Sequence, residues 1–142
     1  MSSTFEIPGR LMGLNEYTNL CRRHHFAGAR AKREQTRMVE ACIMAAKVRR
    51  FSCPVDVGIT WIEGGRMRDH DNIRFGAKFI IDALVNCGVI VDDSPRHLHH
   101  IYDHYMHNET NPRIQVKLMP ASPDGRTVHY APVSGVKGQE WN

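Results

Sequence analysis

The sequence predicts an α+β fold in which a mixed β-sheet is covered by helices, within a single domain of residues 1–120. Three features predict this class. Short segments with alternating or continuous apolar residues, typical of strands, occur early, in the middle and late in the chain. Between them, apolar residues recur every three or four positions, as on one side of a helix. The length of 142 residues is enough to bury a core without disulfides or a structural metal.

Four elements are predicted in the first half of the chain. Residues 4–7 alternate between polar and apolar side chains and are followed by a Pro-Gly pair, as expected of an opening strand. A helix begins near Asn15, and residues 26–50 form the longest helical segment, with a partial apolar face. Residues 55–62 alternate again and predict a second strand.

The second half begins with a helix at residues 73–87, where an apolar stripe ends at a glycine. Residues 89–91, Val-Ile-Val, predict a short buried strand. Residues 97–107 and 114–119 predict the two strands of a hairpin. The last segment, residues 121–142, is rich in Pro, Gly, Ser and Asp and is expected to form an irregular tail.

Composition excludes several classes of protein. No apolar segment approaches the roughly 20 residues that a membrane-spanning helix needs, and the N-terminus lacks the pattern of a secretion signal. The four cysteines include no Cys-x-x-Cys pair, so a zinc ribbon is not expected and the thiols are expected to be free. We therefore expect a cytoplasmic protein that does not contact a membrane.

Charge is unevenly distributed along the chain. Residues 1–50 carry ten Lys or Arg and four acids, whereas residues 51–100 carry five Lys or Arg and seven acids. A basic region attracts a phosphate backbone and an acidic region can hold a cation, which is the combination that a metal-dependent nuclease needs. The cationic side chains that we assign to DNA binding are Arg22, Arg23, Arg30, Lys32 and Arg33. A solvent-exposed amphipathic helix is the alternative explanation of the same cluster.

Acidic side chains lie at both ends of the last predicted helix. Asp69 and Asp71 leave the same side of an extended chain, about 7 Å apart, and Asn72 or Asp71 can cap the helix that follows. Lys78 lies two helical turns after Asp71 on roughly the same face. The next predicted strand ends on Asp92-Asp93, of which only one can face inward. Strand, helix and strand are therefore expected to bring three carboxylates and one lysine together at one end of the unit.

Carboxylates crowded in this way repel one another unless a cation lies between them. Mg²⁺ is the expected cation, with Mn²⁺ as a substitute, because it prefers oxygen ligands and keeps positions open for phosphate oxygens. Such a metal can stabilise the attacking and leaving oxygens of a phosphodiester, while a lysine offsets the developing charge. The pattern indicates hydrolysis of a nucleic-acid backbone.

Other polar residues receive simpler interpretations. Asp56 and Glu63 are expected to be ordinary surface acids. Five of the nine histidines lie in one predicted strand, where His97, His99 and His107 share a side, so a zinc site is a minor alternative. Polar decoration of an edge strand is the preferred interpretation of these histidines.

Two stretches of the chain carry a further signal. The first reads Ile7-Pro8-Gly9-Arg10-Leu11-Met12-Gly13-Leu14-Asn15-Glu16-Tyr17, followed by Gly28-Ala29-Arg30-Ala31-Lys32. The second reads Arg68-Asp69-His70-Asp71-Asn72, followed by Lys78-Phe79-Ile80-Ile81-Asp82-Ala83-Leu84 and Gly88-Val89-Ile90-Val91-Asp92-Asp93-Ser94. Together they resemble the RusA-like Holliday-junction resolvases, small endodeoxyribonucleases of phages and prophages.

The resemblance implies a RusA-like fold and a crossover junction endodeoxyribonuclease that works in the bacterial host cell. It also implies a homodimer that makes paired nicks in four-way DNA and needs Mg²⁺. The residues that it assigns to metal binding and catalysis are Asp69, Asp71 and Asp93, with Lys78 as the catalytic lysine. Asn15 and Arg68, which lie in the matched stretches, are added as DNA contacts.

The sequence departs from the family pattern in one place. Seven residues separate Asp71 from Lys78, whereas four separate the corresponding residues in the founding members. An insertion of three residues is nearly one helical turn, so the lysine keeps its face while its reach changes. Asp82, four residues after Lys78, is expected to form a structural ion pair on the helix.

We therefore expect a Mg²⁺-dependent, structure-selective endonuclease of DNA recombination and repair. A junction- or duplex-binding protein without catalysis is the alternative from another class, and cleavage in Mg²⁺ compared with EDTA separates the two. A sugar-nucleotide transferase, with a metal diphosphate held by Asp69-His70-Asp71, is disfavoured because such enzymes normally need a larger chain.

Overall fold

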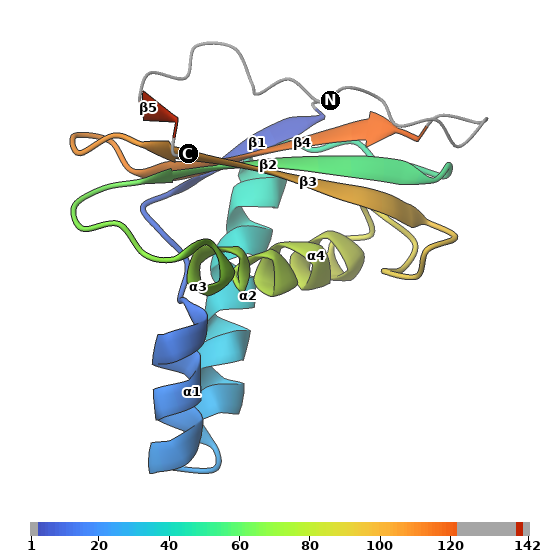
Figure 1. Cartoon of the computed structure of the whole chain (residues 1–142). Helices are drawn as coiled ribbons and strands as arrows, with labels where there is room; N and C mark the ends of the chain where they lie inside the picture. Colours follow the sequence, from blue (N-terminus) through green and yellow to red (C-terminus); the bar gives the residue numbers. More distant parts are fainter. Residues whose placement is uncertain (1–2, 122–138, 141–142) are drawn as a thin grey trace.

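The computed structural model describes residues 3–121 and 139–140 and shows the expected α+β architecture (Figure 1). Among these residues, a mixed sheet with the strand order β1-β4-β2-β3-β5 lies on a layer of helices. The strands are β1 (Thr4–Pro8), β2 (Val55–Glu63), β3 (Leu98–His107), β4 (Arg113–Pro120) and β5 (Gln139–Glu140). The helices are α1 (Leu14–Arg23), α2 (Ala27–Ala45), α3 (His70–Arg74) and α4 (Ala77–Asn86).

The predicted hairpin between β3 and β4 is wrong, although both strands are present. β2 lies between them, parallel to β3 and antiparallel to β4. The connection from β3 to β4 passes the end of β2, where the amide of Asn108 donates to the carbonyl of Glu63 (2.8 Å). Every residue of β2 is buried, and a strand of this kind is most stable in the centre of a sheet, with both edges paired.

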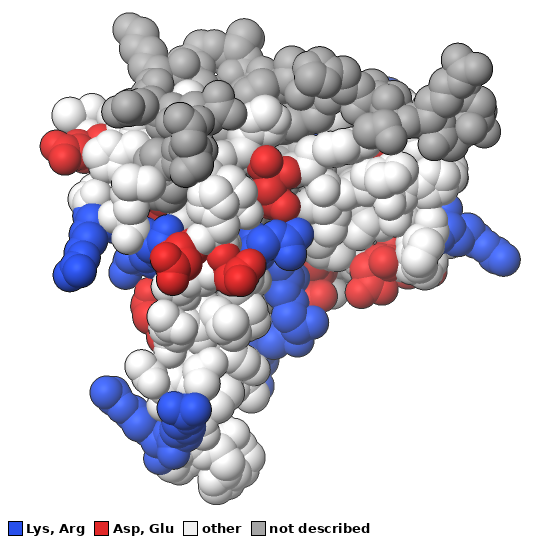
Figure 2. Space-filling model, viewed as in Figure 1, with Lys and Arg blue, Asp and Glu red and all other residues white. Residues whose placement is uncertain are grey.

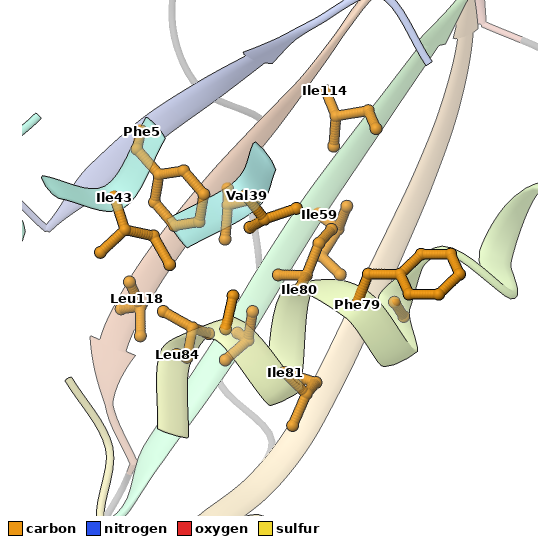
Figure 3. Close-up of a cluster of buried hydrophobic side chains, with 14 of the residues drawn as sticks. Phe5, Val39, Ile43, Ile59, Phe79, Ile80, Ile81, Leu84, Ile114 and Leu118 are labelled. Atoms are coloured by element: carbon orange, nitrogen blue, oxygen red, sulfur yellow. The ribbon is translucent and has the colours of Figure 1, made fainter. Parts of the chain in front are cut away.

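The helices pack on one face of the sheet and close a single hydrophobic core. Val39 and Ile43 of α2 and Ile80 and Leu84 of α4 form one buried cluster with Ile59 of β2 (Figure 3). Burying an aliphatic side chain of this size stabilises the fold by about 1.5–3 kcal/mol. The apolar stripes that predict the two helices are therefore the surfaces that hold them on the sheet.

The helix predicted at residues 73–87 is divided into α3 and α4. At the break, the amide of Gly76 donates to the carbonyl of Ile73 (3.1 Å) and that of Lys78 to the carbonyl of Phe75 (3.2 Å), a tighter pattern than in an α-helix. A β-carbon on Gly76 would lie 3.0 Å from Cβ of Leu11. The break is therefore set by close packing against the loop that enters α1.

The short strand predicted at residues 89–91 is wrong. Val89 and Ile90 are buried as expected, but they lie in a turn, where the amide of Val89 donates to the carbonyl of Leu84 (2.9 Å). Gly88, with φ 71°, ends the helix as predicted. Val89 and Ile90 therefore contribute to the core from a turn and not from a strand.

α1 and the first half of α2 form a hairpin that projects away from the sheet (Figure 1). α1 has no buried residue. The two helices approach closely at Gly28, where a β-carbon would collide with Sγ of Cys21. α2 ends at Ala45, before the predicted end at residue 50, because Lys47 adopts a left-handed conformation with φ 52°.

The predicted tail lies mostly outside the described residues. Within it, β5 pairs antiparallel with Met106 and His107 at the end of β3, so residues 139–140 are not irregular. No helix in the described ranges is both long and apolar enough to cross a bilayer.

Candidate active site

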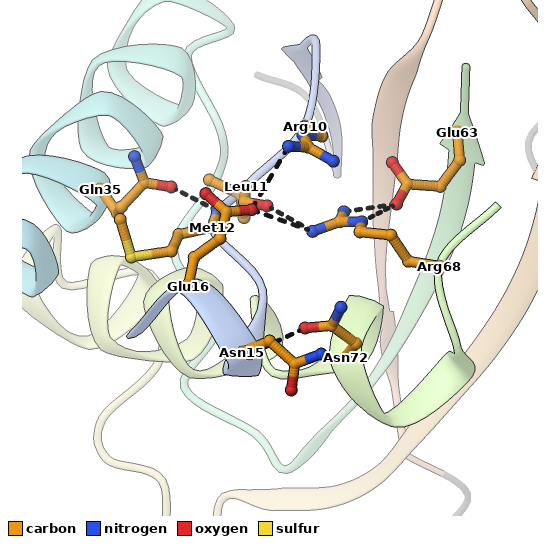
Figure 4. Close-up of polar contacts among 9 residues, drawn as sticks. All are labelled: Arg10, Leu11, Met12, Asn15, Glu16, Gln35, Glu63, Arg68 and Asn72. Carbon is orange, nitrogen blue, oxygen red and sulfur yellow. Dashed lines mark hydrogen bonds and ion pairs between the residues drawn. The ribbon is translucent and has the colours of Figure 1, made fainter. Parts of the chain in front are cut away.

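The two stretches that carry the family resemblance meet in the structure (Figure 4). The amide of Asn15 donates to Oδ1 of Asn72 (3.0 Å) across 57 positions of sequence, and the guanidinium of Arg68 donates to the carbonyl of Leu11 (3.3 Å). A β-carbon on Gly13 would collide with Asn72 and would lie 2.7 Å from Nη1 of Arg68. Residues 11–15 and 68–72 therefore form one packed unit, which we call the motif junction.

Asn72 caps a helix, but not the helix that was predicted. α3 begins after Asp69 and has no side-chain cap. The side chain of Asn72 instead satisfies the Asn15 amide in the first turn of α1, a position at which backbone amides have no partner within the helix. The side chain thus joins the start of α1 to the start of α3.

Arg68, predicted to contact DNA, is directed into the protein. Its guanidinium forms a hydrogen bond (Nε to Oε1, 2.6 Å) and an ion pair with Glu63 at the end of β2 (Figure 4). It also lies 3.8 Å from the carboxylate of Glu16. The side chains of Arg68 and Glu63 are only 11% and 6% exposed, so the pair fixes the motif junction to the sheet.

Two acids that were expected on the surface are buried. Glu63 is neutralised by Arg68, as described, and Asp56 lies within 3.3 Å of Nδ1 of His100. Buried carboxylates require such partners because desolvation of an unpaired charge is costly. The signal for Glu63 in the sequence is its place at the end of an apolar strand, five residues before an arginine.

Asp69 and Asp71 are exposed at the start of α3. The prediction that both lie in an extended segment is wrong for Asp71, because only Asp69 is extended (φ −64°, ψ 149°) and the helix begins at His70. The carbonyl of Asp69 accepts the amide of Ile73 (3.0 Å), which closes the first turn. The two carboxylates therefore leave neighbouring positions of a helix start and remain open to solvent.

α3 is held against the end of β3 by two contacts. The ring of His70 stacks on that of Tyr105, with centroids 3.7 Å apart and an angle of 4°. Arg74 forms an ion pair with Asp103 (3.1 Å), whose other oxygen accepts from the indole of Trp61 (2.8 Å). The carboxylate of Asp103 raises the pKa of Arg74, and burial is the main cause of the raised pKa of Tyr105.

The second acidic group follows α4. Oδ1 of Asp92 accepts the amide (2.9 Å) and the hydroxyl (2.6 Å) of Ser94, and lies 2.9 Å from Nδ1 of His97. These hydrogen bonds, chiefly those from Ser94 and His97, lower the pKa of Asp92 to about 2. Asp93 is exposed. Asp92 is thus occupied in stabilising the turn, while Asp93 is the carboxylate left open to solvent.

A cavity of about 520 Å³ lies beside this second group, between α2 and α4. Its charged lining consists of Lys32, Arg33, Arg37 and Glu40 from α2, Asp82 from α4, and Asp92 and Asp93 from the following loop. Lys32 forms an ion pair with Asp82 (3.5 Å). Asp82 therefore has the structural role that was predicted, but its partner is on α2 and is not Lys78.

The three acids do not come together within the chain. Asp71 lies at the start of α3, beside Tyr105. Asp92 is hydrogen-bonded to His97, which directly precedes Leu98 at the start of β3. Leu98 and Tyr105 are separated by about 23 Å along β3. Figure 1 likewise shows α3 and the loop after α4 at opposite ends of the helical layer. The predicted convergence of Asp69, Asp71 and Asp93 is therefore wrong for a single chain, because the strand expected at residues 89–91 is a turn beyond α4.

The separation of the acids bears on the expected Mg²⁺ site formed by Asp69, Asp71 and Asp93. In the described residues, no group of three or more His, Cys, Asp or Glu side chains is placed to hold a metal ion. Lys78 is exposed on α4 and forms no ion pair with the three acids within that part of the chain. The described part of the chain thus does not fit a Mg²⁺ centre built from three carboxylates, nor a zinc site built from His97, His99 and His107.

The predicted DNA-binding residues fall into three places. Asn15 is exposed in the first turn of α1, next to the start of α3. Lys32 and Arg33 line the cavity beside Asp93. Arg22, Arg23 and Arg30 are exposed near the far end of the α1–α2 hairpin. A neutral amide side chain therefore lies near the first acidic group, whereas cations lie beside the second acidic group and at a third, distant position.

Comparison of the sequence with protein-family models found no match, and comparison with curated proteins also found none.

Proposed function

We propose that this protein is a structure-selective endodeoxyribonuclease that acts on branched DNA as a homodimer, with Mg²⁺ as its cofactor. One observation carries the proposal. The motif junction joins two stretches that are distant in sequence and, through the hydrogen bond from the Asn15 amide to Asn72, holds Asn15 at the start of α3, where the exposed residues Asp69 and Asp71 also lie. A polar group that can contact DNA thus lies next to acids of the kind that serve phosphodiester hydrolysis.

The second acidic group supports the same substrate. Asp93 shares a cavity with Lys32 and Arg33, and cations beside an acid can hold a phosphate backbone against the repulsion of the carboxylate. The ion pair between Lys32 and Asp82 leaves Arg33 and Arg37 as the exposed cations on this wall, and Arg33 is the one that the sequence assigns to DNA. Arg33 is therefore assigned to phosphate binding.

Asp69 and Asp71 would face the phosphodiester at one end of the helical layer, where a carboxylate can accept the proton that the attacking water loses, and Asp93 would face the DNA at the other end. Two symmetric nicks in a four-way junction need two active sites related by a two-fold axis, which a homodimer provides. The dimer would bring a second copy of each acidic group to the DNA. Within one chain Mg²⁺ would be held by Asp69 and Asp71 without Asp93, since this ion needs only one or two carboxylates beside its waters, and it would supply charge neutralisation at the phosphodiester.

A binding protein without nuclease activity is the second candidate. The separation along β3 favours it, because Asp93 of one chain lies too far from Asp69 and Asp71 to share an ion with them, and the described residues contain no cluster of three metal ligands. Both candidates need the same cationic surface, so DNA binding alone does not distinguish them.

The experiment is a nicking assay on labelled four-way, flap and linear duplex DNA of equal length. Each substrate is incubated with the full chain in Mg²⁺ and in EDTA, and the products are separated under denaturing conditions. The nuclease proposal predicts cuts in the four-way DNA in Mg²⁺, few in the linear duplex and none in EDTA. Tight junction binding without a nick in either condition would favour the binding protein.

A further inference from the structure

The turn between α1 and α2 presents three aromatic rings to solvent. It consists of His24, His25 and Phe26, and all three residues are exposed. The rings of His25 and Phe26 have centroids 4.0 Å apart, and those of His24 and His25 are stacked at 4.9 Å with an angle of 15°. We call these three residues the hairpin tip.

The exposure of Phe26 is not explained by the fold. The residue is 60% exposed and lies outside the hydrophobic core. It occupies the N-cap of α2 without a side-chain cap, where Ser, Thr, Asp or Asn would stabilise the helix and an aromatic residue does not. Nδ1 of His24 accepts the Phe26 amide instead (3.2 Å). An apolar ring is thus held outward at a place where a polar residue would favour folding.

Cations surround the hairpin tip. From Thr18 to Arg33 the sequence contains five Lys or Arg and no acid. Three of these cations, Arg22, Arg23 and Arg30, are exposed within a turn or so of the rings. On the face shown in Figure 2, the lower end of the molecule carries blue side chains and no red ones. This end of the hairpin therefore combines aromatic faces with a uniformly positive field.

We propose that the hairpin tip binds unpaired nucleobases of branched DNA, a role that rests on the proposed DNA substrate. A base would stack on the rings of Phe26 and His25, while Arg22, Arg23 and Arg30 contact the phosphates on either side. Aromatic faces with flanking cations bind single strands in this way because every base has a π-face and every nucleotide carries a negative charge. A second copy of the chain is a weaker candidate for binding at the hairpin tip, because the cations of the two tips would repel each other.

The hairpin also sets a distance from the tip to the acids. α1 runs from the motif junction to the tip, and its ten residues span about 15 Å. Along duplex DNA this distance corresponds to about four base steps of roughly 3.4 Å each. The unpaired bases are therefore held about four base pairs from the bond that faces Asp69 and Asp71.

The test uses the full chain and fluorescence-labelled DNA with 2-aminopurine at one unpaired position of a fork, beside a linear duplex of equal length. Phe26→Ala and Phe26→Leu remove the aromatic face, Phe26→Tyr keeps it, and Met44→Ala removes another exposed apolar side chain at the opposite end of α2. We expect the Ala and Leu variants to bind the fork about ten-fold more weakly and to lose 2-aminopurine quenching. Duplex binding should be unchanged, and the Tyr and Met44 variants should resemble the wild type.

Three results would overturn the assignment. Equal fork affinity for wild type and Phe26→Ala would exclude stacking, even if the wild type cleaves the fork and the proposed function stands. Wild-type fork affinity of Phe26→Leu would show that the residue at position 26 makes only an apolar contact and does not stack on a base. A loss of self-association in Phe26→Ala, measured by sedimentation and without a loss of fork binding, would assign the tip to a second copy of the chain. Conversely, the wild type could bind the fork through the hairpin tip and yet never nick DNA. That result would support base binding at the tip and contradict the proposed nuclease activity.

Discussion

Asn72 accepts a hydrogen bond from the backbone amide of Asn15 and so joins the start of α3 to the start of α1. Asn72→Ala leaves that amide without its partner and should destabilise the protein by about 1 kcal/mol. Asn72→Asp keeps an acceptor near the positive end of α1 and should preserve stability. Urea unfolding of the three proteins measures the difference. Equal midpoints for the Ala variant and the wild type would mean that the hydrogen bond does not support the fold.

Breaking the buried ion pair between Arg68 and Glu63 should destabilise the protein more than breaking the hydrogen bond between Asn15 and Asn72. Arg68→Ala leaves a carboxylate buried without its cation, for which we expect a loss of about 3 kcal/mol. The double variant Arg68→Met with Glu63→Gln removes both charges and should recover most of that loss. Urea unfolding again gives the values. A double variant no more stable than Arg68→Ala would show that the burial of Glu63 does not set the cost.

The local patterns of the sequence were sufficient to predict β2 and the buried faces of α2 and α4, because alternation and helical periodicity are properties of neighbouring residues. The order of the strands is not such a property. It depends on which strand gains most from burial, and β2, buried throughout its length, occupies the position between β3 and β4.

The site was predictable in its residues but not in its geometry. The order of the acids places Asp69 and Asp71 at a helix start, as found. Their distance from Asp93 depends on the break at Gly76, which is set by packing on Leu11, and on the turn at residues 89–91. The role of Arg68 likewise depends on a partner in β2, and spacing alone cannot separate an inward guanidinium from one that contacts DNA.

Acid should weaken the turn after α4 in a defined pH range. The pKa of Asp92 is lowered from an ordinary 3.8 to about 2, mainly by hydrogen bonds from Ser94 and His97. Because the folded-state pKa is the lower one, the stabilisation is present above pH 3.8 and is lost as the pH falls toward 2. A carboxyl-carbon NMR titration should show a midpoint for Asp92 near 2. A midpoint near the ordinary 3.8 would exclude the hydrogen-bonded turn in solution.

Arg33 should contribute to DNA affinity without distinguishing one sequence from another. Arg33→Gln removes a cation beside Asp93, so binding should weaken equally for all DNA, and the slope of log affinity against log salt should fall by about 1. Lys117→Gln is the control, because Val116 and Leu118 face the core and strand alternation turns Lys117 to the opposite side of the sheet. Fluorescence anisotropy at several salt concentrations measures both slopes. An unchanged slope for Arg33→Gln would remove this residue from the DNA surface.

Cleavage of a four-way junction by Asp71→Asn, measured beside junction binding, tests the central claim most directly. Asparagine keeps the size of the side chain and removes its charge, and Glu109→Gln in the exposed loop before β4 makes the same change at an acid that belongs to neither acidic group. The account predicts that Asp71→Asn binds the junction as tightly as the wild type and loses at least about a hundred-fold in cleavage rate, the scale of a single catalytic group, while Glu109→Gln cleaves normally. Normal cleavage by Asp71→Asn would contradict the assignment of this site to catalysis.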